Sequence, residues 1–242
     1  MTVPAVRLMP TELGPARVHL DPARRRERVL LVLGHGAGGG VEAADLVVLA
    51  ERLPDWGVTV ARVEQPWRVA GRRLAPAPRA LDLVWLSVLG RLRGAVPLVV
   101  GGRSAGARVA CRTAGALHAS GVVALAFPLH PPGRPDRARS AELAGAGVPA
   151  LVLQGERDPF GSAAEVRAAL DRAGMDRAGM DRAGMDRAAL DREPTASPPL
   201  CIREVAGADH GFAVGARGPL TRAEALELIA EAVRTWVLAL PR

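Results

Sequence analysis

Short apolar runs recur along the chain at intervals that leave room for a helix between them. The runs are rich in Val, Leu and Ala and span residues 29–33, 58–63, 98–100, 122–127, 150–153 and 200–205. Their apolar residues are nearly continuous, which is typical of parallel strands covered on both faces. The pattern therefore predicts a parallel sheet with two buried faces. We also expect an edge strand at residues 18–20.

Segments with helical spacing of their apolar residues lie between these runs. They span residues 43–52, 79–92, 105–118, 162–170 and 221–238. Thr221, followed by Glu224, predicts a capping box at the start of the last helix. The alternation of strand and helix predicts an α/β fold, with a doubly wound, mostly parallel sheet and helices on both faces. We expect residues 1–242 to form a single domain of this kind.

One segment departs from this alternation. The unit Asp-Arg-Ala-Gly-Met begins at residues 171, 176 and 181 and then degrades. Each step of five residues turns a helix about 140° past the last, so the Met side chains cannot form one buried stripe. We expect a solvated, low-complexity excursion at residues 171–199, with a marginal helical extension and then a linker at residues 193–199. The pattern favours no binding role for it.

Composition narrows the class of protein further. The chain of 242 residues is 49% hydrophobic, and none of its apolar runs approaches the length of about 18 residues that a membrane helix needs. Prolines and charges interrupt the N-terminus before a signal peptide could form, so we expect a cytoplasmic protein. The net charge is +7, but the basic residues are all Arg and are scattered. We therefore expect neither nucleic acid nor a membrane as partner.

A possible nucleophile follows the third strong apolar run. The sequence PLVVGGRSAG at residues 97–106 joins a short strand to a helical segment through a G-x-S-x-G pattern. In that context the pattern predicts a serine on a sharp, strained turn between strand and helix. Larger residues at positions 102 and 106 would collide with the neighbouring strand and helix. Ser104 is therefore the candidate nucleophile.

A glycine-rich loop, LVLGHGAGGG at residues 31–40, follows the first strong strand. Such a loop bends over the sheet and directs a backbone N–H at a developing oxyanion. We expect the N–H groups of Ala37 and Ala105 to form this oxyanion hole. A phosphate-binding loop is the alternative, but the spacing is not G-x-G-x-x-G and no Lys-Ser/Thr follows. We expect His35 to be a structural hydrogen-bonding residue rather than a base.

An acid and a histidine follow in loops after later strands. QGERDPFG at residues 154–161 contains Asp158, and AGADHGF at residues 206–212 contains His210. The carboxyl ends of parallel strands face one crevice, so Ser104, Asp158 and His210 can converge into a Ser-Asp-His triad. The rival acids are Glu156 and Asp136. The other histidines, outside the expected chain position, are His19, His35, His118 and His130.

The motifs GHGAGG, GGRSAG, LVLQGERDPFG and GADHGF occur in an order that resembles the α/β-hydrolase superfamily. The resemblance covers residues 29–238 and is strongest to small, lidless members similar to dienelactone hydrolase. FPLHPPGRPD at residues 127–136 and QPWRVAGRR at residues 65–73 resemble a bacterial subgroup whose domain also occurs in a subunit of an animal histone-acetyltransferase complex. Two features depart from the common pattern. Arg103 stands where many hydrolases carry an aromatic residue or His, and residues 128–140 are too few for a lid domain.

The resemblance implies hydrolysis of an ester, thioester, lactone or peptide without a cofactor. We expect a serine hydrolase that cleaves a carboxylic ester or thioester of a small acyl substrate through an acyl-enzyme. The alternative is a catalytically silent hydrolase-fold interaction protein, since fold and function separate readily. Arg103 is a candidate for binding an anionic substrate, with pairing to a structural acid as the alternative. Cys111 and Cys201 indicate neither a disulfide nor a metal site.

Overall fold

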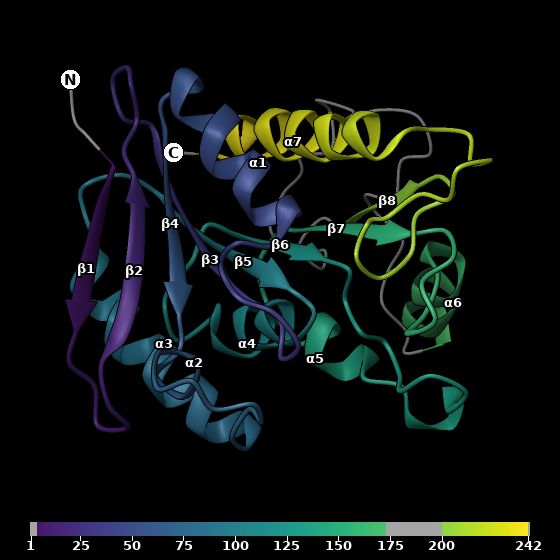
Figure 1. Cartoon of the computed structure of the whole chain (residues 1–242), viewed down its shortest axis with the longest axis horizontal. Coiled ribbons are helices and arrows are strands. Elements are labelled where there is room, and N and C mark those ends of the chain that lie inside the picture. The colour runs from purple at the N-terminus through teal and green to yellow at the C-terminus, as the bar shows by residue number, and fades with distance from the viewer. Residues whose placement is uncertain (1–3, 173–199, 242) are drawn as a thin grey trace.

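The computed structural model describes residues 4–172 and 200–241. Within them, eight strands form one sheet in the order β1-β2-β4-β3-β5-β6-β7-β8 (Figure 1). The strands are β1 (Ala5–Met9), β2 (Ala16–Asp21), β3 (Val29–Gly34), β4 (Val58–Glu64), β5 (Leu98–Arg103), β6 (Gly121–Leu125), β7 (Ala150–Gly155) and β8 (Leu200–Val205). Pairing is parallel from β4 to β8 across the sheet, and β2 pairs antiparallel with β1 and β4. The predicted doubly wound, mostly parallel sheet is confirmed.

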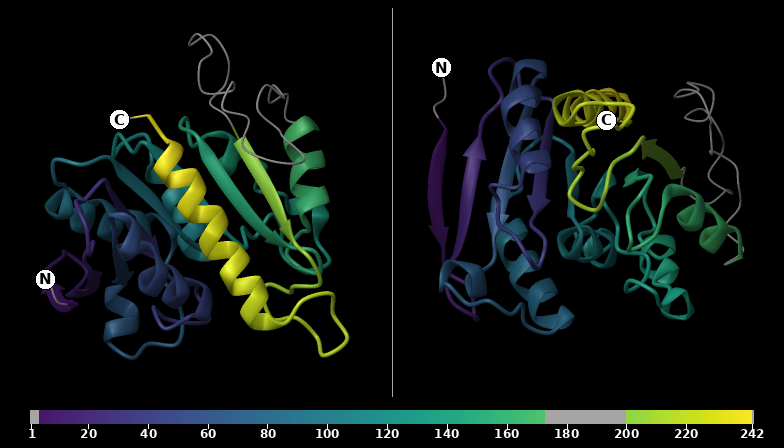
Figure 2. Two further views of the ribbon diagram at one scale, coloured as in Figure 1. Left: turned by 90° about the horizontal axis from the view of Figure 1, so that it is seen from above. Right: turned by 45° about the vertical axis from the view of Figure 1, so that its right-hand side comes forward.

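Helices cover both faces of this sheet. They are α1 (Ala44–Arg52), α2 (Pro66–Val69), α3 (Pro78–Leu92), α4 (Ala105–Thr113), α5 (Ser140–Ala144), α6 (Ala163–Arg172) and α7 (Arg222–Ala239), with 3₁₀ turns η1 (Leu53–Trp56) and η2 (Pro135–Arg137). Helices α1 and α7 cover one face, and α2 to α6 cover the other (Figures 1 and 2). The two faces of β3 show why its sequence is continuously apolar. Leu31 packs with α1 and α7, whereas Val32 packs on the opposite side.

Several boundaries differ from the sequence prediction. The expected edge strand at residues 18–20 is β2, but β1 pairs outside it and forms the edge. Strand β6 ends at Leu125, because Ala126 turns the chain with a φ of 45°. Helix α4 ends at Thr113 rather than at residue 118, where His118 also has a positive φ of 45°.

The start of the last helix is confirmed in detail. The Thr221 hydroxyl accepts a hydrogen bond from the Glu224 backbone N–H at 3.2 Å, and the Glu224 carboxylate accepts one from the Thr221 N–H at 2.7 Å. This reciprocal capping box satisfies two N–H groups that the first helical turn leaves unpaired.

The pentapeptide repeat lies mostly beyond the part of the chain that the structure describes. Helix α6 ends at Arg172 and β8 begins at Leu200, so the expected excursion and linker fall outside the described residues. Among residues 4–172 and 200–241, none of the helices combines the length and the hydropathy that a membrane span requires.

Candidate active site

Ser104 lies on the turn that joins β5 to α4, at the carboxyl edge of the sheet. Its backbone has φ 51° and ψ −113°, which is a strained conformation for a residue with a Cβ. The N–H of Ser104 donates to the carbonyl of Leu125 on the neighbouring β6, at 2.9 Å. The sharp strand-to-helix turn predicted from G-x-S-x-G is therefore present.

Two glycines make this turn possible. A Cβ on either Gly102 or Gly106 would overlap the carbonyl oxygen of Gly34 at the end of β3. Gly102 also has a φ of 154°, which side chains rarely allow. The backbone of the turn can thus lie directly against the neighbouring strand, and this close approach fixes the position of Ser104.

His210 forms hydrogen bonds with both Ser104 and Asp158. Its Nε2 lies 2.9 Å from Ser104 Oγ, and its Nδ1 lies 2.8 Å from Asp158 Oδ2. The tautomer with hydrogen on Nδ1 satisfies both contacts, because Nδ1 then donates to the carboxylate and Nε2 accepts from the hydroxyl. The parallel pair of Gly155 with Val205 brings the loops that follow β7 and β8 side by side. The structure therefore brings together the three residues that the sequence singled out.

Asp158 is held in place by further contacts. Its side chain is fully buried, its Oδ1 accepts from the Phe160 N–H at 2.8 Å, and its Oδ2 accepts from Gln154 Nε2 at 2.9 Å. The ring of Phe160 also packs on His210, with 4.3 Å between ring centroids. These contacts leave the carboxylate and the imidazole little freedom to change their relative orientation.

Arg103 connects the serine turn to a second buried carboxylate, that of Asp45. The sequence alone did not indicate a role for Asp45. Its Nε donates to Asp45 Oδ2 at 2.9 Å, and its Nη2 donates to the backbone carbonyl of His210 at 2.7 Å. Asp45 belongs to the first turn of α1, and burial raises the pKa of its carboxyl, whereas the charge of Arg103 acts in the opposite direction. Arg103 thus forms the structural ion pair that was the alternative to substrate binding.

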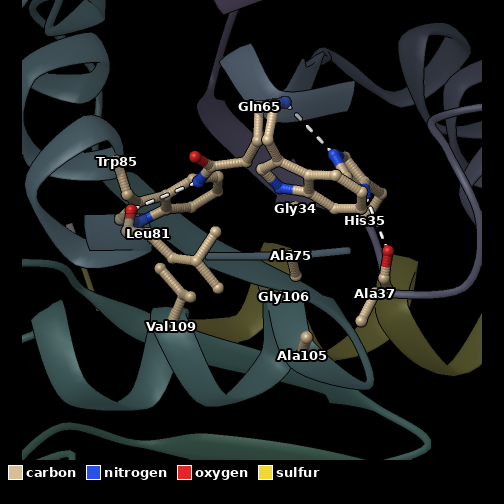
Figure 3. Close-up of a pocket in the computed structure, with 12 residues that line it drawn as sticks. Gly34, His35, Ala37, Gln65, Ala75, Leu81, Trp85, Ala105, Gly106 and Val109 are labelled. Atoms are coloured by element: carbon tan, nitrogen blue, oxygen red, sulfur yellow. Dashed lines mark hydrogen bonds between the residues drawn. The ribbon is translucent and has the colours of Figure 1, made fainter. Parts of the chain in front are cut away.

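The glycine-rich loop after β3 lies beside Ser104. A Cβ on Gly36 would lie 3.4 Å from the Cβ of Ser104, and Ala37 and Ala105 line the same pocket (Figure 3). His35 in this loop uses both ring nitrogens in backbone contacts. Its Nδ1 lies 2.8 Å from the carbonyl oxygen of Gly36, and its Nε2 accepts from the N–H of residue 65 at 3.1 Å.

The rival residues lie elsewhere. The Glu156 carboxylate accepts from the Gly207 N–H at 2.6 Å, and Asp136 forms an exposed ion pair with Arg134. His19 lies on β2, and His130 Nδ1 contacts the carbonyl oxygen of the next residue at 2.9 Å. In the part of the chain that the structure describes, none of these side chains forms a hydrogen bond with the Ser104 hydroxyl, which pairs with His210.

The described residues contain no group of three or more His, Cys, Asp or Glu side chains arranged to hold a metal ion. Cys111 is buried and Cys201 is partly buried, and both are free thiols. Burial raises the pKa of the Cys111 thiol to about 12, so this thiol stays protonated near neutral pH.

The order of the strands and the serine turn after β5 define an α/β hydrolase fold. The sequence pattern of the alpha/beta hydrolase domain family matches residues 27–179, and the chain belongs to this family. No curated protein matches the chain in sequence.

Solved structures of similar fold cover nearly the whole chain. XC6422 from Xanthomonas campestris, described as a serine hydrolase without a lid, has a TM-score of 0.70 at 20% identity and covers 100% of this chain and 97% of its own. Dienelactone hydrolase from Anabaena variabilis has a TM-score of 0.63 at 18% identity and covers 99% of each chain. Est1E from Butyrivibrio proteoclasticus has a TM-score of 0.67 at 13% identity and covers 96% of this chain and 97% of its own. Because these sequence identities are low, the structural similarity establishes the fold alone.

Proposed function

We propose that this protein is a serine hydrolase that cleaves a carboxylic ester or thioester of a small substrate through an acyl-enzyme. The observation that carries the proposal is the chain of hydrogen bonds from Asp158 through His210 to Ser104 on its strained turn. Its partner is a small acyl compound rather than a nucleic acid or a membrane, and its expected location is the cytoplasm.

The geometry supports a two-step acyl transfer. Ser104 Oγ attacks the substrate carbonyl carbon while its proton passes to His210 Nε2, and Asp158 stabilises the imidazolium that forms. The N–H groups of Ala37 and Ala105 donate to the oxyanion of the tetrahedral intermediate. The C–O or C–S bond then breaks, and His210 protonates the leaving alcohol or thiol. A water molecule then attacks the acyl-serine in the same way, with His210 accepting its proton, and the carboxylic acid is released.

The structural neighbours agree with this class of reaction. They include a protein named as a dienelactone hydrolase and a domain of a Rhodothermus marinus protein named as an esterase. Membership of the bacterial subgroup that shares its domain with the histone-acetyltransferase subunit stays a prediction from residues 65–73 and 127–136.

Labelling with a fluorophosphonate probe tests the proposal, because only an activated serine reacts with it. We expect the wild type to be labelled and to hydrolyse 4-nitrophenyl acetate, and Ser104→Ala to lose both properties. Ser87→Ala, on helix α3, is the matched control and should retain both. A wild type that is neither labelled nor active would instead support the catalytically silent interaction protein.

A further inference from the structure

Gln154 is a completely buried residue on β7, the strand that leads to Asp158. It carries the one polar side chain of that strand. Side chains alternate between the two faces of a strand, and the core contacts of Val152 place Gln154 on the face that α2 to α6 cover. A buried amide destabilises a fold unless its polar atoms are paired, so its partners need an explanation.

The amide nitrogen of Gln154 faces three oxygen atoms. Nε2 lies 2.6 Å from the carbonyl oxygen of Gly161, 2.9 Å from Asp158 Oδ2 and 3.2 Å from the carbonyl oxygen of Phe127. Because all three are acceptors, only the nitrogen end of the amide can face them. The amide has two N–H groups, and the two shorter distances identify Gly161 and Asp158 as its main acceptors.

The oxygen end of the same amide is unpaired. Gln154 Oε1 is buried and accepts no hydrogen bond from the residues that the structure describes. An unpaired buried acceptor destabilises the fold, so this position is not optimised for stability alone. Such departures from full pairing are typical of functional sites, and here they direct attention to the N–H groups at the other end of the amide.

Gln154 fixes the plane of the Asp158 carboxylate together with one backbone group. The Phe160 N–H donates to Oδ1 at 2.8 Å and Gln154 donates to Oδ2, so each carboxylate oxygen has its own fixed donor. A single hydrogen bond at Oδ1 would leave the carboxylate free to swing about that atom, which would move Oδ2 away from His210 Nδ1. Gln154 therefore holds the oxygen atom that His210 contacts.

The same amide connects two loops at the carboxyl edge of the sheet. Phe127 follows β6, and Gly161 closes a turn that begins at Asp158, whose backbone carbonyl accepts from the Gly161 N–H at 3.1 Å. By bonding the carbonyl of Gly161 as well as the carboxylate of Asp158, Gln154 holds both the side chain of the acid and the backbone turn that carries it.

We propose that Gln154 is a positioning residue of the triad, which keeps Asp158 Oδ2 directed at His210 Nδ1 while the imidazolium forms. The inference rests on the proposed function. Gln154 acts through Asp158 and takes no part in binding the substrate. Its loss should therefore lower kcat, which depends on the orientation of the acid, and leave KM nearly unchanged.

Replacing the amide by a thioether tests the inference. Gln154→Met keeps the length of the side chain and removes both N–H donors. We expect kcat for 4-nitrophenyl acetate to fall about 10- to 100-fold, with KM within about twofold of wild type. The matched control is Val152→Ala on the same face of β7, which removes buried contacts without removing a donor and should keep kcat within about twofold. Thermal melting establishes that each variant is folded.

A second background separates positioning from a general structural role. Asp158→Ala removes the group on which Gln154 acts. In that background Gln154→Met should lower the residual kcat by less than about twofold, because two residues that act as a unit have non-additive effects. A structural defect elsewhere would lower kcat by the same factor in both backgrounds.

Gln154→Glu provides a second test should Gln154→Met not melt cooperatively. The two side chains, Gln and Glu, have nearly the same size, but a carboxyl group donates at most one hydrogen bond where the amide donates two. We therefore expect kcat to fall by about tenfold or more in this variant as well.

The outcomes separate this inference from the proposed function. A folded Gln154→Met with kcat within about threefold of wild type would overturn the inference and leave the proposed function standing. An equal loss of kcat in the wild-type and Asp158→Ala backgrounds would also overturn it. A wild type that neither hydrolyses the ester nor reacts with the fluorophosphonate would overturn the proposed function and, with it, the inference.

Discussion

Two buried aspartates act on His210, and they do so through different parts of the residue. Asp158 contacts the imidazole Nδ1 directly, whereas Asp45 acts through Arg103, which donates to the backbone carbonyl of His210. The two carboxylates are almost equally inaccessible, with 0% and 2% of their side chains exposed. Their burial therefore does not distinguish their roles.

The groups that contact the two carboxylates do distinguish the roles of Asp158 and Asp45. Asp158 contacts a ring whose charge changes during the proposed reaction, and its other donors are the neutral Gln154 and Phe160. Asp45 contacts a guanidinium, whose charge is permanent. One aspartate is thus suited to stabilise a charge that appears in the reaction, and the other to hold a loop in a fixed position. A catalytic histidine needs both its ring and its backbone to be fixed.

The largest effects should follow from changing Asp158 and the two residues to which its hydrogen bonds lead, His210 and Ser104. Asp158→Asn should lower kcat by roughly 10³- to 10⁴-fold, because an amide stabilises the wrong tautomer of His210 and cannot stabilise the imidazolium. His210→Ala should be about as damaging as Ser104→Ala. Steady-state kinetics with a 4-nitrophenyl ester measure all of these. The control is Glu156→Gln in the same loop, which should stay within about twofold of wild type. A silent Asp158→Asn with an inactive Glu156→Gln would show that the acid is misassigned.

A smaller effect should follow from breaking the ion pair. Arg103→Gln should lower kcat by roughly 10- to 100-fold with little change in KM, because the loop that carries His210 loses a fixed donor. Arg103→Lys should recover part of the loss. Neutral and carboxylate-bearing esters should lose activity equally. A selective loss on the anionic ester would instead support the prediction that Arg103 binds substrate.

Measurements of stability should separate two contributions of the Asp45–Arg103 ion pair, one to the free energy of unfolding and one to the position of His210. Asp45→Asn should lower the free energy of unfolding by about 3 kcal/mol, because it leaves Arg103 largely buried without a counter-charge. The double variant Asp45→Leu/Arg103→Met should regain most of that stability but keep the low kcat, since neither side chain then bonds His210. Urea unfolding and kinetics on the same samples measure both. A double variant with full activity would show that the pair does not position His210.

The smallest effect should come from the pentapeptide repeat. Deleting residues 174–187 should leave kcat and the melting temperature nearly unchanged, because the repeat has no consistent apolar face with which to dock. Thermal melting and ester hydrolysis of the deletion variant provide the measurement. A large drop in either would show that the segment packs against the domain or contributes to the site.

The two aspartates also differ in how far the sequence predicts them. Asp158 follows a strand, in a glycine-containing loop at the chain position that a parallel sheet brings beside Ser104. Asp45 lies in the first turn of a helix, where an acid is favourable in any protein. No spacing in the sequence connects it to Arg103, because that contact depends on how α1 packs over the end of β5.

Other features of the fold could not be predicted from the sequence, for similar reasons. Strand β1 is flanked by prolines and exposes Val6 and Leu8, so it lacks the apolar pattern of the buried strands. Helices α2 and α5 are too short to show a helical period. Trp67 and Trp85 lie 18 positions apart along the chain, and only the packing of α2 and α3 places both on one pocket.

The position of the repeat has a genetic consequence. The repeat belongs to the segment between Arg172, where α6 ends, and Leu200, where β8 begins. Leu200 is at the end of β8 that is farthest from His210. The register of β8 on β7, and not the number of residues between them, sets the separation of His210 from Asp158. Each repeat unit is a whole number of codons, so slippage during replication adds or removes units without a frameshift. We therefore expect a change in the number of repeat units to leave the separation of His210 from Asp158 unchanged.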